Sequence, residues 1–221
     1  MHDDIDTLIG AARRQMGDRP ADDRFIQLLE AGLVPTERLV RLACELYHLV
    51  SSDERSFTLL ASRFSSTSAG EVFAELAQGE TQARELLLRF AAELDTDEER
   101  LAAHEPAPLA HAYPSYLART AAFGTRSDML LALLANVGES GTNYARTADA
   151  LHGRYGFTER AIEHFRFFAD TPRELLDRAA AALRSGLAEG DDPTSAVRTA
   201  RLVHAYENTF WACLSENLEP H

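Results

Sequence analysis

The spacing of apolar residues is helical along almost the entire chain. Residues three, four and seven positions apart share one face of a helix, whereas a half-buried strand alternates apolar and polar residues. No convincing alternating segment occurs, so the sequence predicts an all-α fold. Capping residues, prolines and glycines divide the chain into seven to nine helices, without repeats or long linkers.

Helix bounds are predicted from capping residues and helix breakers. Two short helices within residues 1–34 are expected to pack on the outside of the bundle. The segment Thr171-Pro172-Arg173-Glu174 is a capping pattern with Pro at the first helical position, so the apolar stretch before it is predicted to end there. We expect one domain over residues 1–221. The other predicted helices cover approximately 35–64, 68–94, 113–123, 127–154, 158–169, 172 onward and 192–218.

The charged residues argue against several partners and cofactors. The chain has 35 acidic and 22 basic residues, and its formal net charge is −13. Nucleic acids and anionic membranes attract clustered Lys and Arg, so neither is an expected partner. Every basic residue is Arg. Without Lys the chain can form neither the Schiff base that pyridoxal phosphate (PLP) requires nor a P-loop, so PLP is excluded as a cofactor.

The cysteines and the N-terminus suggest a compartment. Cys44 and Cys213 are far apart and form no CxxC motif, which suits a reducing environment. The first residues are acidic and lack the apolar core of a signal peptide. No apolar run approaches the roughly 20 residues of a membrane span. A cytoplasmic location is therefore expected.

Several ionisable residues interrupt apolar helix faces. Glu207 shares a face with Val203, Phe210, Trp211 and Leu214. An unpaired carboxylate is costly to bury, so such a group finds a partner, binds a metal or takes up a proton. Positions of this kind are therefore candidates for chemistry. Further candidates on apolar faces are Glu45, His48, Glu80, Glu139 and His164.

These candidates also have structural interpretations. Arg84, one turn after Glu80, is a possible ion-pair partner, so both interpretations of Glu80 stay open. His164 lies on an aromatic face, where a histidine is more often a core residue with its hydrogen bonds satisfied. The ExxH spacing of Glu45 and His48 is very common and is weak evidence by itself.

The last helix, with the sequence RLVHAYENTFWACLSE, resembles the C-terminal helix of TenA-type proteins (thiaminase II). This resemblance implies that Glu207 is a catalytic acid/base in a pocket. The segment LACELYHLV is similar to the TenA helix with a pocket Asp and, one turn later, a Tyr, which places Glu45 and His48 at substrate-binding positions. The TenA nucleophile is a Cys on a central helix. The corresponding segment LLANVGESGTNYART has no Cys, so nucleophilic thiaminase chemistry is not expected.

The middle of the chain resembles the heme-oxygenase-like diiron oxidases and oxygenases. The segments LAQGETQARELLLRFAAEL and ANVGESGTNYARTADALHGRYGF are similar to their first two ligand helices, which places Glu80 and Glu139 at metal-ligand positions. The family's third ligand helix carries His, Asp and His. The positions that correspond to these ligands cannot bind a metal: they are Phe168, Pro172 and Leu175. His164 is the candidate replacement, and iron remains an open alternative as a cofactor.

Together these resemblances imply a heme-oxygenase-like helical bundle around one small-molecule pocket. The leading hypothesis is an enzyme that acts on a small nitrogen-containing metabolite, in vitamin or specialised-metabolite biosynthesis, with Glu207 as general acid/base. Glu139 would be its partner, a metal ligand or an anchor for a substrate ammonium group, and Tyr144 and Tyr206 would hydrogen-bond the substrate. The alternatives are an iron- and O₂-dependent oxidase with a shifted ligand set and a non-catalytic binding protein. A homo-oligomer is expected, since helical relatives of this size commonly associate.

Overall fold

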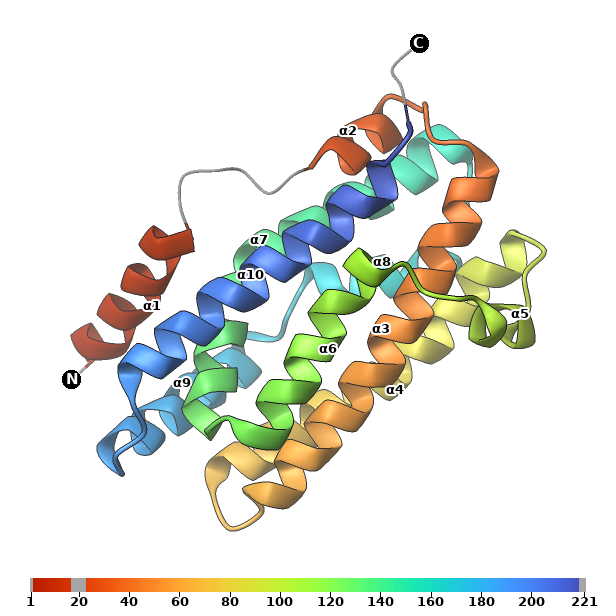
Figure 1. The fold of residues 1–221 in the computed structure, drawn as a ribbon. Coiled ribbons are helices and arrows are strands. Elements are labelled where there is room, and N and C mark those ends of the chain that lie inside the picture. Colours follow the sequence, from red (N-terminus) through yellow and green to blue (C-terminus); the bar gives the residue numbers. More distant parts are fainter. Residues whose placement is uncertain (1, 17–22, 219–221) are drawn as a thin grey trace.

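The computed structural model describes residues 2–16 and 23–218, and every regular element in these ranges is a helix (Figure 1). The all-α prediction is therefore confirmed. These ranges contain ten helices, more than the predicted seven to nine, because short segments such as Glu98–Ala103 close as separate helices. Among the described residues, none of the helices combines the length and the apolar composition that crossing a bilayer requires.

The helices differ widely in length, from 6 to 30 residues. In chain order they are α1 (His2–Met16), α2 (Arg24–Glu30), α3 (Thr36–Arg63), α4 (Ser68–Glu93), α5 (Glu98–Ala103), α6 (Pro108–Phe123), α7 (Arg126–Tyr155), α8 (Glu163–Ala169), α9 (Arg173–Ala188) and α10 (Pro193–Ser215).

The predicted capping residues are correct at some helix starts and wrong at others. Asp192 caps α10, since its carboxylate accepts hydrogen bonds from the backbone N–H groups of Thr194 and Ser195. The capping pattern predicted at Thr171 does not form, because α9 begins without a side-chain cap, and α4 also begins without one. The break at Thr171-Pro172 is nevertheless present, and it separates α8 from α9.

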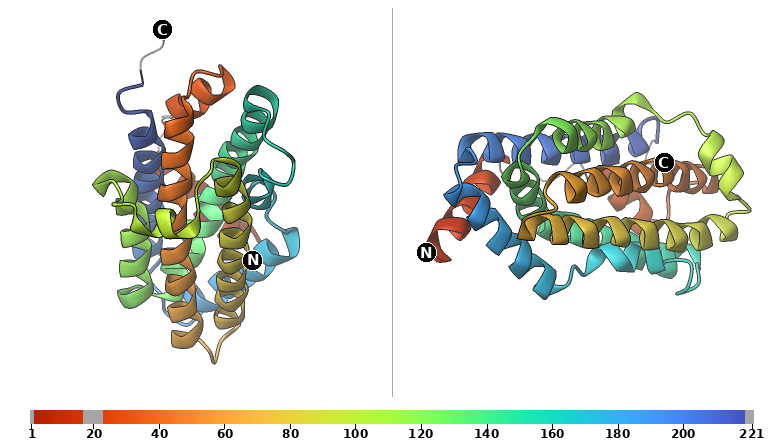
Figure 2. Two further views of the ribbon diagram at one scale, coloured as in Figure 1. Left: turned by 90° about the vertical axis from the view of Figure 1, so that its right-hand side faces the viewer. Right: turned by 90° about the horizontal axis from the view of Figure 1, so that it is seen from below.

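The long helices α3, α4, α6, α7 and α10 form an elongated bundle (Figures 1 and 2). α3 and α4 make an antiparallel hairpin, α10 packs against α6 and α7, and α8 and α9 cover α4 and α7. α1 lies along the outer side of α10. The neighbouring α2 contributes more to the interior, because Phe25, Ile26, Leu28 and Leu29 are all buried.

The buried apolar side chains form two clusters, one toward each end of the bundle. The first cluster joins α2 to the start of α3 and the ends of α4, α7 and α10, and it contains Phe25, Phe90 and Trp211. The second joins the end of α3 to the starts of α4, α7 and α10 and to α9, and it contains Phe73 and Leu183. The middle of the bundle, between the two clusters, contains the buried carboxyl groups of Asp53 and Glu80.

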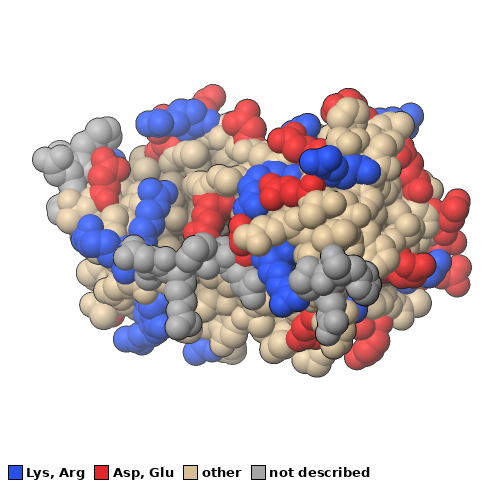
Figure 3. Space-filling model, turned by 90° about the horizontal axis from the view of Figure 1, so that it is seen from above, with Lys and Arg blue, Asp and Glu red and all other residues tan. Residues whose placement is uncertain are grey.

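Acidic and Arg side chains are interspersed on the face shown in Figure 3. Ion pairs of this kind also connect helices. The guanidinium of Arg146 lies 2.9 Å from Asp23 Oδ2 and 2.8 Å from Glu30 Oε1, which ties α7 to α2. The hydrogen bond from Arg146 lowers the pKa of Glu30. A carboxylate paired with Arg in this way has a lowered pKa, as Glu30 shows.

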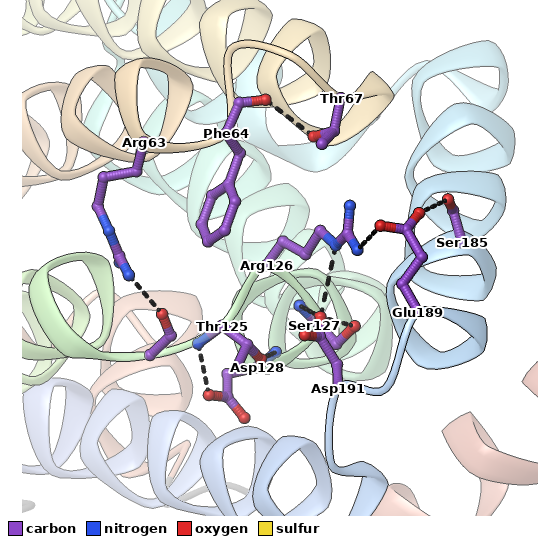
Figure 4. A network of polar contacts seen from close by, with 11 residues as sticks. Arg63, Phe64, Thr67, Thr125, Arg126, Ser127, Asp128, Ser185, Glu189 and Asp191 are labelled. Atoms are coloured by element: carbon purple, nitrogen blue, oxygen red, sulfur yellow. Dashed lines mark hydrogen bonds and ion pairs between the residues drawn. The ribbon is translucent and has the colours of Figure 1, made fainter.

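A polar network fixes the N-terminus of α7 (Figure 4). Thr125 and Asp128 form a capping box there. The Arg126 side chain donates to Glu189 Oε2 at 2.6 Å, and the Ser127 hydroxyl donates to Asp191 Oδ2 at 2.7 Å. The network therefore holds the start of α7 against the loop between α9 and α10.

We expect Gly186→Ala to lower the free energy of unfolding by about 1–3 kcal/mol, because a methyl group would overpack this network. A Cβ at Gly186 would collide with Ser127 Oγ and lie 2.8 Å from Asp191 Oδ2. Gly153→Ala is the matched control in α7, where a Cβ has no neighbour within 4 Å. That change should leave stability unchanged or raise it by up to about 1 kcal/mol. Urea denaturation measures both, and equal stability of the two variants would contradict the prediction.

Candidate active site

Two adjoining cavities lie in the middle of the bundle. Their volumes are about 150 Å³ and about 70 Å³. The residues that line both cavities come from α3, α4, α6, α7, α10 and α8 and are mostly polar: Asp53, Glu80, Tyr113, Ser140, Phe168 and Glu207. The cavities therefore meet at a layer that contains three carboxyl groups.

Each carboxyl group interrupts an apolar run in the middle of a long helix. On α3, Asp53 lies between Val50 of the first apolar cluster and Phe57 of the second. On α10, Glu207 lies in the same way between Val203 and Phe210. Because Asp53 and Glu207 line the same two cavities, these interruptions meet at one level of the bundle. Ser140 of α7 contributes a hydroxyl at that level.

Asp53 and Glu80 are buried, with exposed fractions of 2% and 8%. Among the described residues neither group has a cationic partner, and neither Asp53 Oδ1 nor Glu80 Oε2 has a hydrogen-bond partner. Burial raises the pKa of Asp53 well above its usual value, and the charge of Glu207 adds to the effect. Burial likewise raises the pKa of Glu80, with added repulsion from Asp53 and Glu54. Both groups therefore have an oxygen atom that could accept a hydrogen bond from a ligand.

Glu207 as a whole residue is half-buried. It lines both cavities. Burial raises its pKa to about 7, although hydrogen bonds donated by the Ser140 hydroxyl and the Trp211 indole act in the opposite direction. The nearby charge of Glu139 contributes to the increase. A carboxyl group with a pKa near 7 can both give and accept a proton at neutral pH, which suits general acid/base catalysis.

Two tyrosines complete the polar layer. Tyr113 lines both cavities, and Tyr144 lines the smaller one. Burial, reinforced by the neighbouring carboxyl groups, raises the pKa of each phenol well above its usual value. Both phenols therefore stay protonated and can donate a hydrogen bond to a ligand.

A family model described as TENA/THI-4/PQQC matches residues 14–214 of the chain. The chain belongs to the TENA/THI-4/PQQC family. A search of curated proteins gives no match.

Solved structures give the fold of this family member. A TenA homologue from Pyrococcus furiosus is 19% identical, with a TM-score of 0.71 over 95% of this chain and 98% of that one. A TenA homologue from P. horikoshii is 18% identical, with a TM-score of 0.69 over 96% and 97%. A domain from Shewanella denitrificans with a heme oxygenase-like fold is 13% identical, with a TM-score of 0.67 over 96% and 89%. The predicted resemblance and the heme-oxygenase-like fold are both confirmed.

Three of the predicted site residues line the cavities of this TENA/THI-4/PQQC protein. Glu80 and Glu207 line both cavities, and Tyr144 lines the smaller one. The roles assigned to them remain predictions. Arg84, the partner considered for Glu80, instead pairs with Glu54 at 2.7 Å.

Glu139, by contrast, is not in the lining. Its side chain is 44% exposed and its Oε2 lies 3.7 Å from His204 Nδ1. The reason is helical geometry, because consecutive residues point about 100° apart. Ser140, the next residue, faces the cavities instead. Glu139 therefore lies outside the cavity lining, its assignment as a site residue stays a prediction, and its influence on Glu207 is electrostatic.

Glu45 and His48 also lie away from the cavities. Glu45 Oε1 accepts a hydrogen bond from the Ala107 N–H at 3.0 Å and lies 3.4 Å from His104 Nε2. His48 Nε2 is 2.8 Å from the carbonyl oxygen of His104. Together they fasten the linker between α5 and α6, and His48 also lines a separate surface cleft. Their assignment to substrate binding stays a prediction that the lining of the two cavities does not support.

Tyr206 is likewise outside the lining, since its ring packs against Tyr116 with centroids 5.2 Å apart. Asp53, which lines both cavities, was not among the residues predicted from the sequence. Asp53 has apolar neighbours at the positions that identified Glu207, namely Leu49, Val50 and Phe57. The same criterion could therefore have found it.

The residues predicted to hold a metal do not converge. His164 is fully buried, and its Nδ1 lies 2.8 Å from the carbonyl oxygen of Ala83, which assigns the proton to that nitrogen. Burial lowers the pKa of His164 to about 4, so the ring is neutral at pH 7. Within residues 2–16 and 23–218, no three His, Cys, Asp or Glu side chains are placed to hold one metal ion. The set Glu80, Glu139 and His164 therefore does not fit an iron centre.

No cysteine lines either cavity. Cys44 and Cys213 are buried free thiols, and burial raises the pKa of Cys213 to about 11. Both thiols of this TENA/THI-4/PQQC protein therefore lie outside the cavity lining, and the expected lack of nucleophilic thiol chemistry stays a prediction.

Proposed function

We propose that this protein is an enzyme that carries out acid/base chemistry on a small metabolite with a positively charged nitrogen. One observation carries the proposal: the carboxyl groups of Asp53, Glu80 and Glu207 share the lining of the cavities without a cationic partner. The carboxylate of Glu30, which lies nearer the surface, is in contrast paired with Arg146. A buried cluster of carboxyl groups is stabilised by a ligand that supplies the missing positive charge.

The proposed roles follow from the environment of each group. Asp53 and Glu80 present unpartnered oxygens and would hold the protonated nitrogen. Glu207, with a pKa of about 7, would transfer the proton at the reacting atom. The Ser140 hydroxyl orients Glu207, and the phenols of Tyr113 and Tyr144 would donate hydrogen bonds to the substrate. No step requires a thiol or a metal ion.

The setting proposed for this activity is the biosynthesis of a vitamin or a specialised metabolite. Support comes from membership of the TENA/THI-4/PQQC family and from the similarity to TenA homologues. A cytoplasmic location fits two free buried cysteines.

The test is turnover of amine-containing metabolites by the purified protein, followed by mass spectrometry. We expect Glu207→Gln to lower turnover by about 10²–10⁴-fold, since that is the usual contribution of a general acid/base. The matched control is Glu85→Gln on α4, an exposed residue outside both cavities, which should retain full activity. Equal turnover by Glu207→Gln and the unaltered protein would overturn the assignment. Specific binding without turnover would favour the non-catalytic alternative.

A further inference from the structure

The two cavities differ in chemistry on either side of the carboxyl layer. The smaller one, the aromatic compartment, ends on Tyr144, Phe210 and Trp211. The larger one, the aliphatic compartment, extends from the carboxyl groups between α4, α7 and α9. Beyond the shared layer its walls are mainly aliphatic and include Val72, Leu76, Leu133, Val137, Leu175 and Leu176.

The aliphatic compartment has room for a substantial apolar group. At about 150 Å³, it matches in size an apolar protein cavity that accommodates benzene, so it can hold roughly six carbon atoms. The aromatic compartment, at about 70 Å³, has less than half that volume. Leu133, Val137 and Leu176 are only half-buried, which places the outer part of the aliphatic compartment near solvent.

A polar metabolite would leave these walls without a matching partner. Burying polar groups against aliphatic walls is unfavourable unless they form hydrogen bonds, and Val72, Leu76 and Leu133 offer none from their side chains. An apolar segment gains free energy with each methylene group that leaves water. Although Asn136 and Thr171 also line this compartment, its mainly aliphatic walls favour a ligand with a charged end and an apolar end.

We propose that the substrate is an amphipathic amine, with its ammonium group at the carboxyl layer and an apolar chain of about six carbons in the aliphatic compartment. This inference rests on the proposed function, because Asp53, Glu80 and Glu207 supply the negative end of the site. It adds a specificity that the carboxyl groups alone do not give. The apolar chain, and not only the ammonium group, determines which amines bind.

The experiment measures binding of straight-chain primary amines with two to ten carbons by calorimetry at pH 8. We expect the affinity to increase about three- to fourfold with each methylene group up to about six carbons and then to level off. The alcohols of the same lengths should bind at least tenfold more weakly, because they lack the charge that the carboxyl layer requires.

Substitutions in α9 test whether the apolar chain of the amine occupies the aliphatic compartment. Ala179 lines the aliphatic compartment, so Ala179→Leu should shift the preferred chain to a shorter length. Leu176→Ala enlarges the same compartment at a half-buried position and should shift it to a longer one. Ala181 is exposed on the same helix and does not line the cavity, so Ala181→Leu is the control. Circular dichroism verifies the fold of each variant. Should Ala179→Leu fail to fold, the result for Leu176→Ala alone tests the inference.

Each result separates this inference from the proposed function. Amine affinity that is independent of chain length, or length preferences identical in Leu176→Ala and the unaltered protein, would overturn the amphipathic substrate and leave the carboxyl site intact. Alcohols that bind as tightly as amines would instead overturn the cationic substrate on which the proposed function depends.

Discussion

Replacing Glu207 with Gln is expected to raise the free energy of unfolding by about 3 kcal/mol at pH 8. The pKa of this carboxyl group is about 7 in the folded protein against an ordinary value of 4.5. Between these pH values the folded state binds more protons than the unfolded state, so stability falls as pH rises and the loss is complete above pH 7. Gln cannot ionise and avoids that loss.

Urea denaturation at pH 4 and pH 8 measures the effect. At pH 4 the folded and unfolded states both carry protonated Glu207 to a large extent, so Glu207→Gln should then change stability little. Glu85→Gln, at an exposed position, should change stability by less than about 0.5 kcal/mol at either pH. A Glu207→Gln protein that is less stable at pH 8 would mean that the Ser140 and Trp211 hydrogen bonds outweigh desolvation.

A gain in stability on removing Glu207 would fit a residue retained for activity. A core that needed only to be stable would have an apolar or neutral side chain at this position. The pKa values of Asp53 and Glu80 are raised for the same main reason, burial, so Asp53→Asn and Glu80→Gln act in the same direction. The interior of the bundle therefore carries a cluster of carboxyl groups whose ionisation destabilises the fold, and the proposed cationic ligand would offset that cost.

The helical fold and the position of Glu207 could be predicted because both depend on local periodicity. Glu207 interrupts an apolar face within one helix, and such a pattern is visible without knowing what packs against it. Asp53 has the same pattern, yet the resemblance of a nearby segment to TenA drew attention to Glu45, eight residues earlier on α3. Asp53 lines the cavities, whereas Glu45, about two helical turns earlier, holds the linker between α5 and α6.

The meeting of the side chains could not be predicted, because it depends on how four helices pack. Glu139 and Ser140 are adjacent in sequence, and only the orientation of α7 against its neighbours decides which of them faces the cavities. Ser140 gave no signal of its own, since a small hydroxyl residue is ordinary on any face of a helix. Its importance appears only through its hydrogen bond to Glu207.

The affinity for n-hexylamine is expected to increase by about 10²-fold between pH 5 and pH 8. A primary amine with a pKa near 10 stays protonated over this range, so the change comes from the protein. Glu207 attracts the ammonium group only when ionised, and its pKa of about 7 places the steep part of the curve below pH 7. The raised pKa values of Asp53 and Glu80 act in the same direction.

Calorimetry across this pH range in two buffers of different ionisation enthalpy tests the mechanism. Near pH 6 amine binding should release protons, because the bound cation favours the ionised form of Glu207. In Glu207→Gln both the proton release and the dependence of affinity on pH should diminish, whereas Glu85→Gln should behave as the unaltered protein does. An affinity that stays constant or falls from pH 5 to pH 8 would contradict a cation-binding carboxyl layer, because protonating that layer must weaken its hold on a positive charge.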